Sequence, residues 1–225
     1  MSTSVTVITP WRDAHELAAG YWQAIEAGLA PHDRVIIIDN GSSPTLRDAY
    51  FERTGHGLPA FATILRSSVN LGFSRACNAA MQRVGTDAIL FLNNDIRLRD
   101  AGWLDHIKRA LEPGTLVGAH LRHDPHTAVD GETIPYLDGW CLAGMTSDLH
   151  GLGGWDDLEE PSYYGDNLLC ARASAAGMRL RQVTVGLRHL ENYTSRRLDL
   201  RDEVAERNRA VYEAEVRRLR NTVAA

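Results

Sequence analysis

The sequence has 225 residues, of which 44% are hydrophobic and 24% charged, and its formal net charge at pH 7 is −5. These are the values of a globular protein with one large domain or two small ones, and they argue against a general polyanion-binding protein. The three cysteines are widely spaced without a Cys-x-x-Cys pair, which argues against a disulfide framework or a zinc knuckle and favours a reducing compartment. There is no basic-then-apolar leader and no apolar segment of the ~18–20 residues that span a bilayer, so we expect a cytoplasmic protein without a transmembrane segment.

The first half of the chain alternates strand and helix patterns. Residues 4–9 are rich in β-branched side chains and stop at Pro10, which predicts a first strand. Apolar residues over positions 17–29 recur at i, i+4 and i+8, the pattern of a helix that lies on a sheet. A second buried strand at residues 35–38 runs into a polar cluster at 39–43. The other elements expected here are a short helix and a loop within residues 44–60, a strand at 61–65 and a helix that begins at Phe73.

Residues 87–95 carry the strongest single pattern in the chain. The continuous apolar run Ala88–Leu92 is typical of a strand that is buried on both faces, as in a parallel sheet with helices above and below. Asn93-Asn94-Asp95 then falls at the carboxyl end of that strand, the edge of an open α/β sheet where ligands bind, although these residue types also favour a simple turn. With a helix over residues 101–111, the repeated strand–helix–strand order predicts a mostly parallel three-layer α/β sheet.

Residues 119–165 show no long periodic run and are rich in Gly, His, Asp, Trp and Tyr. A loop-rich stretch of this length inside a compact domain is usually functional. His120, His123 and His126 suggest a metal cluster, but their spacing crosses Pro125, so we favour a solvated loop. The elements expected afterwards are a helix at 166–176 closed by Gly177, a strand at 178–185, a polar loop at 188–195 and a charged helix at about 200–220.

Six segments in this order make the chain resemble an inverting glycosyltransferase of the GT-A fold, in the large family 2 group. The resemblance covers about residues 4–195, and the matching segments are Val-Ile-Thr-Pro-Trp at 7–11, Val-Ile-Ile-Ile-Asp-Asn-Gly-Ser at 35–42, Asn-Leu-Gly-Phe-Ser-Arg-Ala-Cys-Asn at 70–78, Ile-Leu-Phe-Leu-Asn-Asn-Asp at 89–95, Gly-Asp-Asn-Leu-Leu-Cys-Ala-Arg at 165–172, and His189. It implies a GT-A domain over residues 1–198, with a nucleotide-binding half at 1–95 and an acceptor half at 96–198. Residues 199–225 would form a helical extension.

The resemblance implies a divalent cation, Mn²⁺ or Mg²⁺, bound where the diphosphate of a nucleotide-sugar donor leaves. Such an ion stabilises the negative charge of the leaving diphosphate and needs only one or two protein carboxylates besides the phosphates. Asn93-Asn94-Asp95 occupies the family's Asp-x-Asp position, so Asp95 would bind the metal, and His189 matches a histidine that completes the metal site in some relatives. Asn93 departs from the pattern and supplies no ionised oxygen, so we expect weak metal affinity in the absence of nucleotide.

For the donor, the resemblance implies that Asp39 accepts a hydrogen bond from the base. An acceptor suits the imide N–H of uracil, thymine or guanine and favours a UDP-type donor, while a loop-capping aspartate is the competing interpretation. Arg75 would reach phosphate or sugar, unless it lies on a solvated helix face. The rest of the expected nucleotide pocket is Thr9, Pro10, Asn70, Gly72, Asn78 and Asn94.

The catalytic base that the resemblance implies is Asp166. Family members often carry Glu-Asp at the start of this helix, and the Asp takes the proton of the acceptor hydroxyl; here the pair is Gly165-Asp166. An N-cap role is the alternative, because Asp is favoured at that position. The missing Glu bears on how the acceptor is positioned at Gly165. Trp140 and Trp155 are either core residues or sugar-stacking platforms, and we favour core for Trp140 and the acceptor side for Trp155.

Two other functions are compatible with such a fold. A sugar-nucleotide nucleotidyltransferase would need a Gly-rich basic phosphate loop after the first strand, which residues 9–13 do not provide. A non-catalytic nucleotide-sugar binding protein is favoured by Asn93 and Gly165 but opposed by the presence of Asp95 and Asp166. The sequence leaves the hydroxyl acceptor open among a glycan, a lipid-linked sugar, a metabolite, a protein and a modified nucleobase. The C-terminal helix has a thin apolar stripe, so we expect it to pack on the domain or on a second copy in a homodimer.

Overall fold

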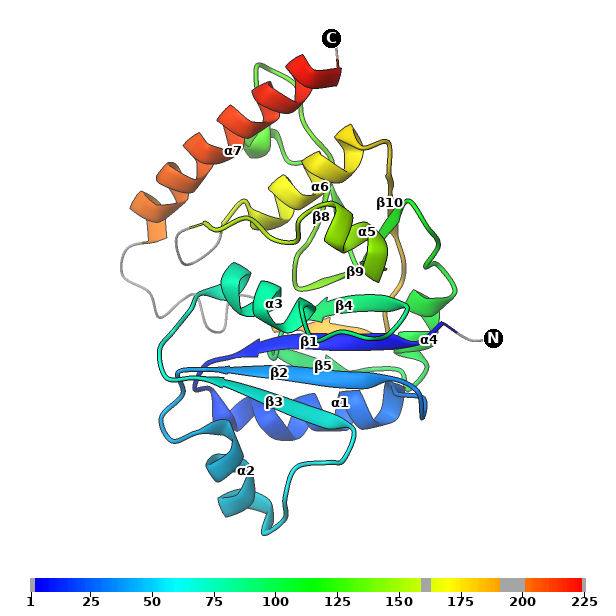
Figure 1. Cartoon of the computed structure of the whole chain (residues 1–225), viewed down its shortest axis with the longest axis vertical. Helices are drawn as coiled ribbons and strands as arrows, with labels where there is room; N and C mark the ends of the chain where they lie inside the picture. The colour runs from blue at the N-terminus through cyan, green and yellow to red at the C-terminus, as the bar shows by residue number, and fades with distance from the viewer. Residues whose placement is uncertain (1–2, 159–162, 191–200, 224–225) are drawn as a thin grey trace.

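A seven-stranded sheet runs through the molecule in the order β10-β6-β9-β4-β1-β2-β3 (Figure 1). The computed structural model describes residues 3–158, 163–190 and 201–223. All strands of this sheet run in one direction except β9, which is antiparallel to both of its neighbours. The strands are β1 (Val5–Trp11), β2 (Arg34–Asn40), β3 (Ala62–Ser67), β4 (Ala88–Leu92), β6 (Thr115–Gly118), β9 (Cys141–Met145) and β10 (Arg179–Gln182). The expected mostly parallel α/β sheet is therefore confirmed.

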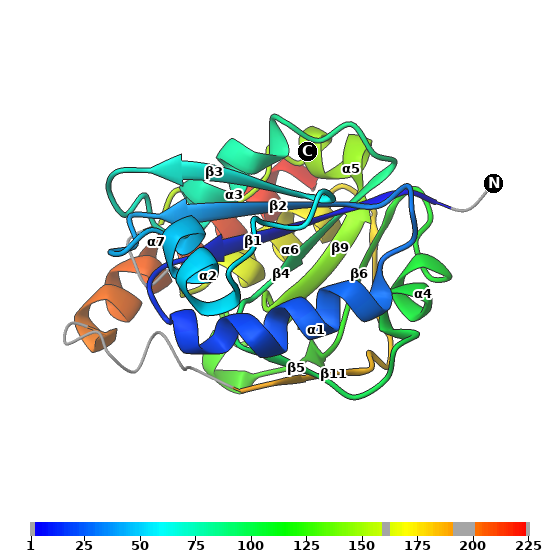
Figure 2. The same cartoon turned by 90° about the horizontal axis from the view of Figure 1, so that it is seen from below.

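Helices cover both faces of the sheet and form the outer layers (Figures 1 and 2). One face packs against α1 (Ala18–Gly28) and α4 (Trp103–Lys108). The other face packs against α3 (Phe73–Met81), α5 (Thr146–Gly151) and α6 (Gly165–Ala175). The remaining elements are α2 (Leu46–Thr54), two 3₁₀ turns (His15–Leu17 and Pro125–Thr127), and two small antiparallel sheets that pair β5 (Ile96–Leu98) with β11 (Leu187–His189) and β7 (Leu121–Arg122) with β8 (Tyr136–Leu137).

Strand β4 is buried along its whole length, as its apolar run predicts. Side chains of a strand alternate between the two faces of a sheet. Leu90 accordingly packs with α1 and α4, whereas Ile89 and Phe91 pack with α3 and α6. With one such strand at its centre, the sheet carries a hydrophobic core on each face.

Strand β1 continues through Pro10 to Trp11, two residues beyond the end that the sequence predicted. Proline lacks the N–H that a ladder between two neighbours requires. The pairing of β1 with β4 covers only Val5–Ile8, so at Pro10 the strand pairs with β2 alone. The proline therefore interrupts no ladder to β4.

Strand β9 is a central element that the sequence did not predict, since residues 119–165 were expected to be rich in loops. It lies between β4 and β6 and contributes to both cores. Its sequence Cys-Leu-Ala-Gly-Met contains no β-branched residue, so it lacks the composition that marks β1 and β2. Gly144 is closely packed there, because a Cβ would lie 2.8 Å from the end of the Leu116 side chain, which would then have to shift.

Helix α7 (Arg201–Val223) packs against α6 through a third apolar cluster. Tyr212 and Val216 are buried against Val129 and Leu168, and the Tyr212 hydroxyl donates to the Thr127 carbonyl oxygen at 2.9 Å. The expectation that this helix packs on the domain is confirmed, while contact with a second copy stays a prediction. The expected domain boundary at residues 198 and 199 lies outside the described residues.

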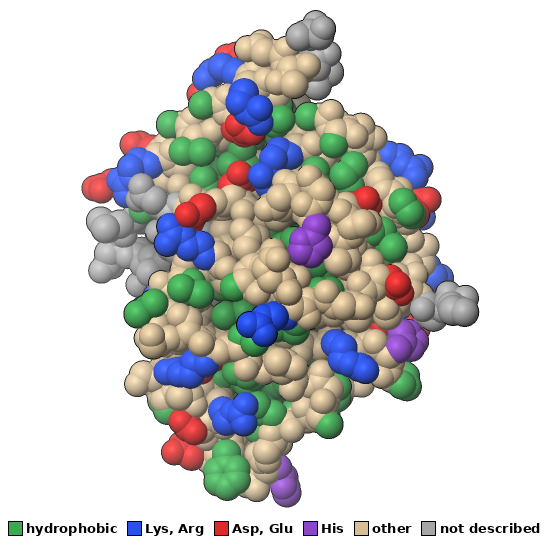
Figure 3. Space-filling view, viewed as in Figure 1, with side chains coloured by type: hydrophobic (Ala, Val, Ile, Leu, Met, Phe, Trp, Pro, Cys, Tyr) green, Lys and Arg blue, Asp and Glu red, His purple; other side chains and the backbone are tan. Residues whose placement is uncertain are grey.

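The described surface carries charges of both signs. On the face seen in Figure 3, Lys and Arg side chains are scattered among Asp, Glu and apolar residues rather than gathered in one patch. In the part of the chain that the structure describes, no helix combines the length and the apolar character needed to cross a membrane.

A buried ion pair ties α4 to the amino ends of β1 and β2. Lys108 Nζ lies 2.6 Å from Asp33 Oδ2, and the same carboxylate accepts from the Val5 N–H at 3.0 Å. Both side chains are buried. Lys108→Ala leaves that carboxylate buried without its cation, so we expect the free energy of unfolding to fall by ~3–5 kcal/mol in urea denaturation. The neighbouring exposed Arg109→Ala is the control, expected to change it by less than ~0.5 kcal/mol; equal effects of both substitutions would contradict a stabilising pair.

Candidate functional site

Asp95 and His189 meet because β5 pairs with β11. Asp95 directly precedes β5, and the antiparallel register sets His189 opposite Ile96. The backbone N–H of Leu190 donates to the Asp95 carbonyl oxygen at 2.9 Å. As a result, His189 Nε2 lies 3.0 Å from Asp95 Oδ1. The two residues that the sequence assigned to the metal site are thus adjacent, although 94 positions separate them.

The Asp95 and His189 side chains suit a divalent cation that has few protein ligands. Asp95 is buried, yet its Oδ1 accepts no hydrogen bond from the described residues, because the contact with His189 lacks hydrogen-bond geometry. Two cis ligands of an octahedral ion, each bound at ~2.1 Å, lie about 3 Å apart, which agrees with the Asp95–His189 separation of 3.0 Å. Within the described ranges, no group of three or more His, Cys, Asp or Glu residues is placed to hold a metal ion. The donor set therefore fits an ion whose other ligands come from water and phosphate.

The segment Asp138-Gly139-Trp140 connects this pair of residues to Asp166. The Trp140 ring stacks on the His189 ring, with the centroids 4.9 Å apart and the planes 4° from parallel. The adjacent Gly139 N–H donates to Asp166 Oδ2 at 2.9 Å. Because neighbouring Cα atoms are only 3.8 Å apart, one short turn before β9 contacts both the expected metal residue and the expected base.

Asp166 is the second residue of α6, and its carboxylate is half-buried. Its Oδ1 accepts from the Asn167 N–H at 3.0 Å. Burial raises the pKa of Asp166 to about 6; the Gly139 N–H opposes this shift, and the nearby Asp138 carboxylate adds to it. The N-cap of α6 is Tyr164, so Asp166 is not the N-cap residue, although it satisfies one N–H of the first turn. A carboxylate that titrates near neutral pH has the property that a general base requires.

The same pKa shift makes a prediction about stability. An acid whose folded-state pKa is raised costs stability as the pH rises from its unfolded value of ~4 through its folded value, which here is about 6. Asp166→Asn removes this cost, but it also removes one acceptor oxygen. We therefore expect the free energy of unfolding of the variant to exceed that of the parent by ~1–2 kcal/mol at pH 8. Below about pH 4.5 the gain should vanish. Urea denaturation at both pH values measures the difference, and a gain that does not depend on pH would contradict the shifted pKa.

Trp155 lies in the core, so its expected place as a sugar-stacking platform is wrong. The ring is buried and meets the Phe73 and Phe91 rings edge to face, with centroids 5.0 and 5.1 Å away. Asn78 fixes the backbone of Trp155 through hydrogen bonds to its N–H and carbonyl at 2.9 and 2.8 Å. Trp140, expected to be core only, is buried but also contacts His189. Apolar composition alone did not distinguish the two tryptophans.

Trp155 nevertheless lies close to the expected base, because both residues border Gly139. A Cβ added at Gly139 would lie 3.2 Å from both Trp155 Cη2 and Asp166 Cβ, so these two side chains flank the same glycine. Gly165, the other residue expected on the acceptor side, is buried as the first residue of α6.

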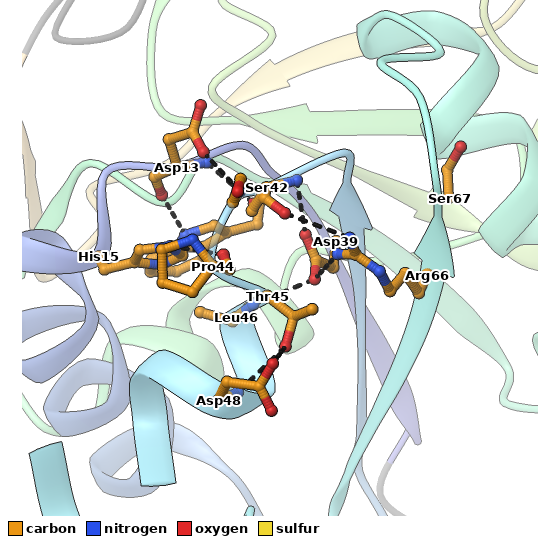
Figure 4. Close-up of polar contacts among 12 residues, drawn as sticks. Asp13, His15, Asp39, Ser42, Pro44, Thr45, Leu46, Asp48, Arg66 and Ser67 are labelled. Carbon is orange, nitrogen blue, oxygen red and sulfur yellow. Dashed lines mark hydrogen bonds and ion pairs between the residues drawn. The ribbon is translucent and has the colours of Figure 1, made fainter. Parts of the chain in front are cut away.

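Asp39, the second-last residue of β2, accepts hydrogen bonds from several donors (Figure 4). Its Oδ1 accepts from the Ser42 N–H at 3.1 Å, and its Oδ2 accepts from the Leu46 N–H at 3.0 Å and from Arg66 Nη1 at 2.6 Å. The loop-capping interpretation of Asp39 is therefore confirmed. Contact with a base stays a prediction. Arg66, which the sequence did not single out, follows from the parallel register that sets it beside Asp39.

Among the other residues expected to bind the donor, those in the loop before α3 are fixed by hydrogen bonds to Asn40, whereas Arg75 lies at the surface. Asn40 binds the loop before α3, donating to Asn70 Oδ1 at 2.8 Å and accepting from the Leu71 N–H at 2.7 Å. Gly72 has φ +84°, a conformation that favours glycine, at the start of α3. Arg75 is exposed and pairs with Asp157 at 2.5 Å. The expected pocket residues also include Pro10, which is half-buried at the end of β1, and Asn94, which is buried beside Asp95.

Thr9 differs from its expected place in the pocket. It is fully buried, and its hydroxyl accepts from the Tyr21 hydroxyl at 2.8 Å. Alternation along β1 turns its side chain toward α1, together with Val7 and Trp11. Only the backbone of Thr9 is left to face a ligand at the sheet edge.

Comparison with known proteins identifies the family. A family model described as "Glycosyl transferase family 2" matches residues 6–159, well over half of the chain. The chain belongs to this family. The matched range contains Asp39 and Asp95 but ends before Asp166 and His189.

Solved structures of glycosyltransferases share the fold. The mannosyltransferase PcManGT from Pyrobaculum calidifontis, in complex with GDP-Man and Mn²⁺, matches with a TM-score of 0.65 at 18% identity, covering 81% of this chain and 55% of that one. TarS 1–349 from S. aureus, in complex with UDP-GlcNAc, has a TM-score of 0.62 at 15% identity and covers 96% and 70%. GalNAc-T7 with UDP, GalNAc and Mn²⁺ has a TM-score of 0.58 at 10% identity and covers 86% and 44%. No curated protein sequence gives a significant match. The GT-A fold is confirmed, and this family 2 chain spans about half the length of the mannosyltransferase.

Proposed function

We propose that the protein transfers a sugar from a nucleoside-diphosphate donor to an acceptor hydroxyl, with inversion at the anomeric carbon. The observation that carries the proposal is the half-buried Asp166 carboxylate with a pKa of about 6, attached through Gly139 and Trp140 to the Asp95–His189 pair. Asp166 suits removal of a proton, and the Asp95–His189 pair suits a cation that also binds the diphosphate. Family membership supports this class of reaction.

In the proposed reaction, Asp166 accepts the proton of the acceptor hydroxyl as that oxygen attacks the anomeric carbon. The new bond forms on the face of the sugar opposite the diphosphate. The bond between the anomeric carbon and the diphosphate breaks at the same time, and the diphosphate leaves with the electron pair of that bond. A general base contributes ~10²–10⁴-fold to such a rate, and it works best with a pKa near the working pH. Burial raises the pKa of Asp166 to about 6, so its carboxylate is basic enough to take the proton.

Asp95 and His189 would hold Mn²⁺ or Mg²⁺, which supplies charge stabilisation for the departing diphosphate. Trp140 fixes the plane of the His189 ring by stacking on it. Asn93 Nδ2 lies 3.3 Å from His189 Nε2. An amide there adds no negative charge, so the ion would depend on the diphosphate for much of its binding. The preference for a UDP-type donor is part of the proposal and rests on Asp39 together with the groups that it binds.

Binding and turnover test the proposal in two stages. Thermal shift with UDP, GDP, CDP and ADP, each with and without Mn²⁺, should show stabilisation that requires both nucleotide and metal. Sugar nucleotides of the best base should then release nucleoside diphosphate when acceptors are added. A protein that binds no nucleoside diphosphate under any of these conditions is not a nucleotide-sugar transferase.

A further inference from the structure

Asp39 is enclosed by its neighbours. Its side chain is 1% exposed, and both carboxylate oxygens already accept hydrogen bonds from Ser42, Leu46 and Arg66. Because the side chain is almost fully buried, a nucleobase can reach Asp39 directly only if one of these neighbouring groups moves aside. A ligand that binds over this part of the sheet edge therefore contacts a side chain other than Asp39 first.

That group is Arg66. Its side chain is 42% exposed, and the register of β3 on β2 brings it out beside Asp39 at the carboxyl end of both strands. The guanidinium is held at two points, by Asp39 Oδ2 at 2.6 Å and by the Ser42 carbonyl oxygen at 3.2 Å (Figure 4). These two bonds use two of its five N–H donors. The Arg66 guanidinium is thus a fixed positive group at the sheet edge, and it can donate hydrogen bonds but cannot accept them.

Donors of this kind discriminate between bases. Uracil, thymine and guanine present keto oxygens, at O4 or at O6, where cytosine and adenine present an amino group. A guanidinium donates a hydrogen bond to a keto oxygen. Facing an amino group, which is also a donor, it forms no hydrogen bond, so the guanidinium and the amino group are both left without an acceptor. The interaction is also geometric, since guanine O6 and N7 together match the two-pronged fork.

We propose that Arg66, anchored by Asp39, selects donors with a keto-bearing base against donors with an amino-bearing base. This inference rests on the proposed function, because it places the base of the nucleotide at the ends of β2 and β3. Arg66 is then the residue that contacts the base. Asp39 is a positioning residue that orients the guanidinium.

Calorimetry with UDP, GDP, CDP and ADP in the presence of Mn²⁺ tests this assignment. The wild-type protein should bind the better of UDP and GDP at least ~10-fold more tightly than CDP and ADP. Arg66→Lys keeps a cation beside Asp39 but loses the planar fork, so this preference should fall to within ~3-fold while affinity for CDP and ADP changes little. Arg66→Gln, whose carbonyl oxygen accepts from amino groups, should remove the preference or reverse it. Arg34→Lys, an exposed arginine at the opposite end of β2, is the matched control and should leave the preference unchanged.

The outcomes separate this inference from the function on which it rests. A wild-type protein that binds all four nucleotides equally overturns the role of Arg66, and this result needs no variant to fold. An equal loss of affinity for all four nucleotides in Arg66→Lys also overturns it, since a structural role weakens binding without regard to the base. If wild type keeps its preference and turnover while both Arg66 variants retain that preference, the inference fails and the proposed function stands. If no nucleoside diphosphate binds at all, both fail.

Discussion

Replacing Asp95 by alanine should reduce sugar transfer to background, a loss of at least ~10³-fold, because the charge stabilisation of the leaving diphosphate disappears. It should also abolish the dependence of nucleoside-diphosphate binding on Mn²⁺. The fold should survive, since Asp95 Oδ1 accepts no hydrogen bond from the described residues. Isothermal calorimetry of UDP and GDP, with and without Mn²⁺, measures the binding.

A matched control separates this effect from a general loss of negative charge. Asp105 is an exposed carboxylate on α4, on the face of the sheet packed by α1. Asp105→Ala should keep both transfer and metal-dependent binding. If Asp95→Ala binds nucleoside diphosphate with unchanged Mn²⁺ dependence, the metal assignment is wrong even if activity is lost.

Asp166→Asn should lower kcat by at least ~10²-fold while the donor dissociation constant stays within ~2-fold. The carboxylate in the proposed reaction faces the acceptor hydroxyl rather than the diphosphate, so only the proton transfer is removed. In the parent protein the rate should fall about tenfold per pH unit below pH 6, because burial raises the pKa of Asp166 to about 6 and only the ionised form accepts a proton. Steady-state kinetics from pH 5 to 8 and calorimetry of the donor measure these effects.

Three outcomes of this substitution have different meanings. If Asp166 only satisfies N–H groups at the start of α6, the variant turns over like the parent. If the protein is a binding module, neither form turns over with any acceptor, although both bind the nucleotide sugar. A large fall in donor affinity would instead place Asp166 against the diphosphate and contradict its role as the base.

Much of the sheet could be predicted because its parallel strands carry strong local patterns. The apolar run Ala88–Leu92 predicted a strand buried on both faces, and the structure confirms it. The polar residues that follow β2 and β4 also lie at one sheet edge, since parallel strands end on the same side. Sequence order alone therefore located the candidate site.

Local patterns could not predict the contacts within the site, because these contacts come from pairings distant in sequence, and only the resemblance placed Asp95 and His189 together. His189 meets Asp95 only through the pairing of β11 with β5, and nothing in a polar loop near residue 188 indicates a strand. Trp155 was expected at the acceptor side, yet its packing between Phe73 and Phe91 depends on how α3 and β4 meet. The burial of Asp166, which sets its pKa, likewise depends on Gly139 from a turn that the sequence left as loop.

The stereochemistry of transfer tests the central claim most directly. With an α-linked sugar nucleotide and Mn²⁺, proton NMR during the first turnovers assigns the anomeric configuration of the product, formed on an added acceptor or by hydrolysis with water. A single displacement assisted by Asp166 predicts the β-anomer as the first product. An α-linked first product, formed before mutarotation, would show retention and contradict the proposed mechanism.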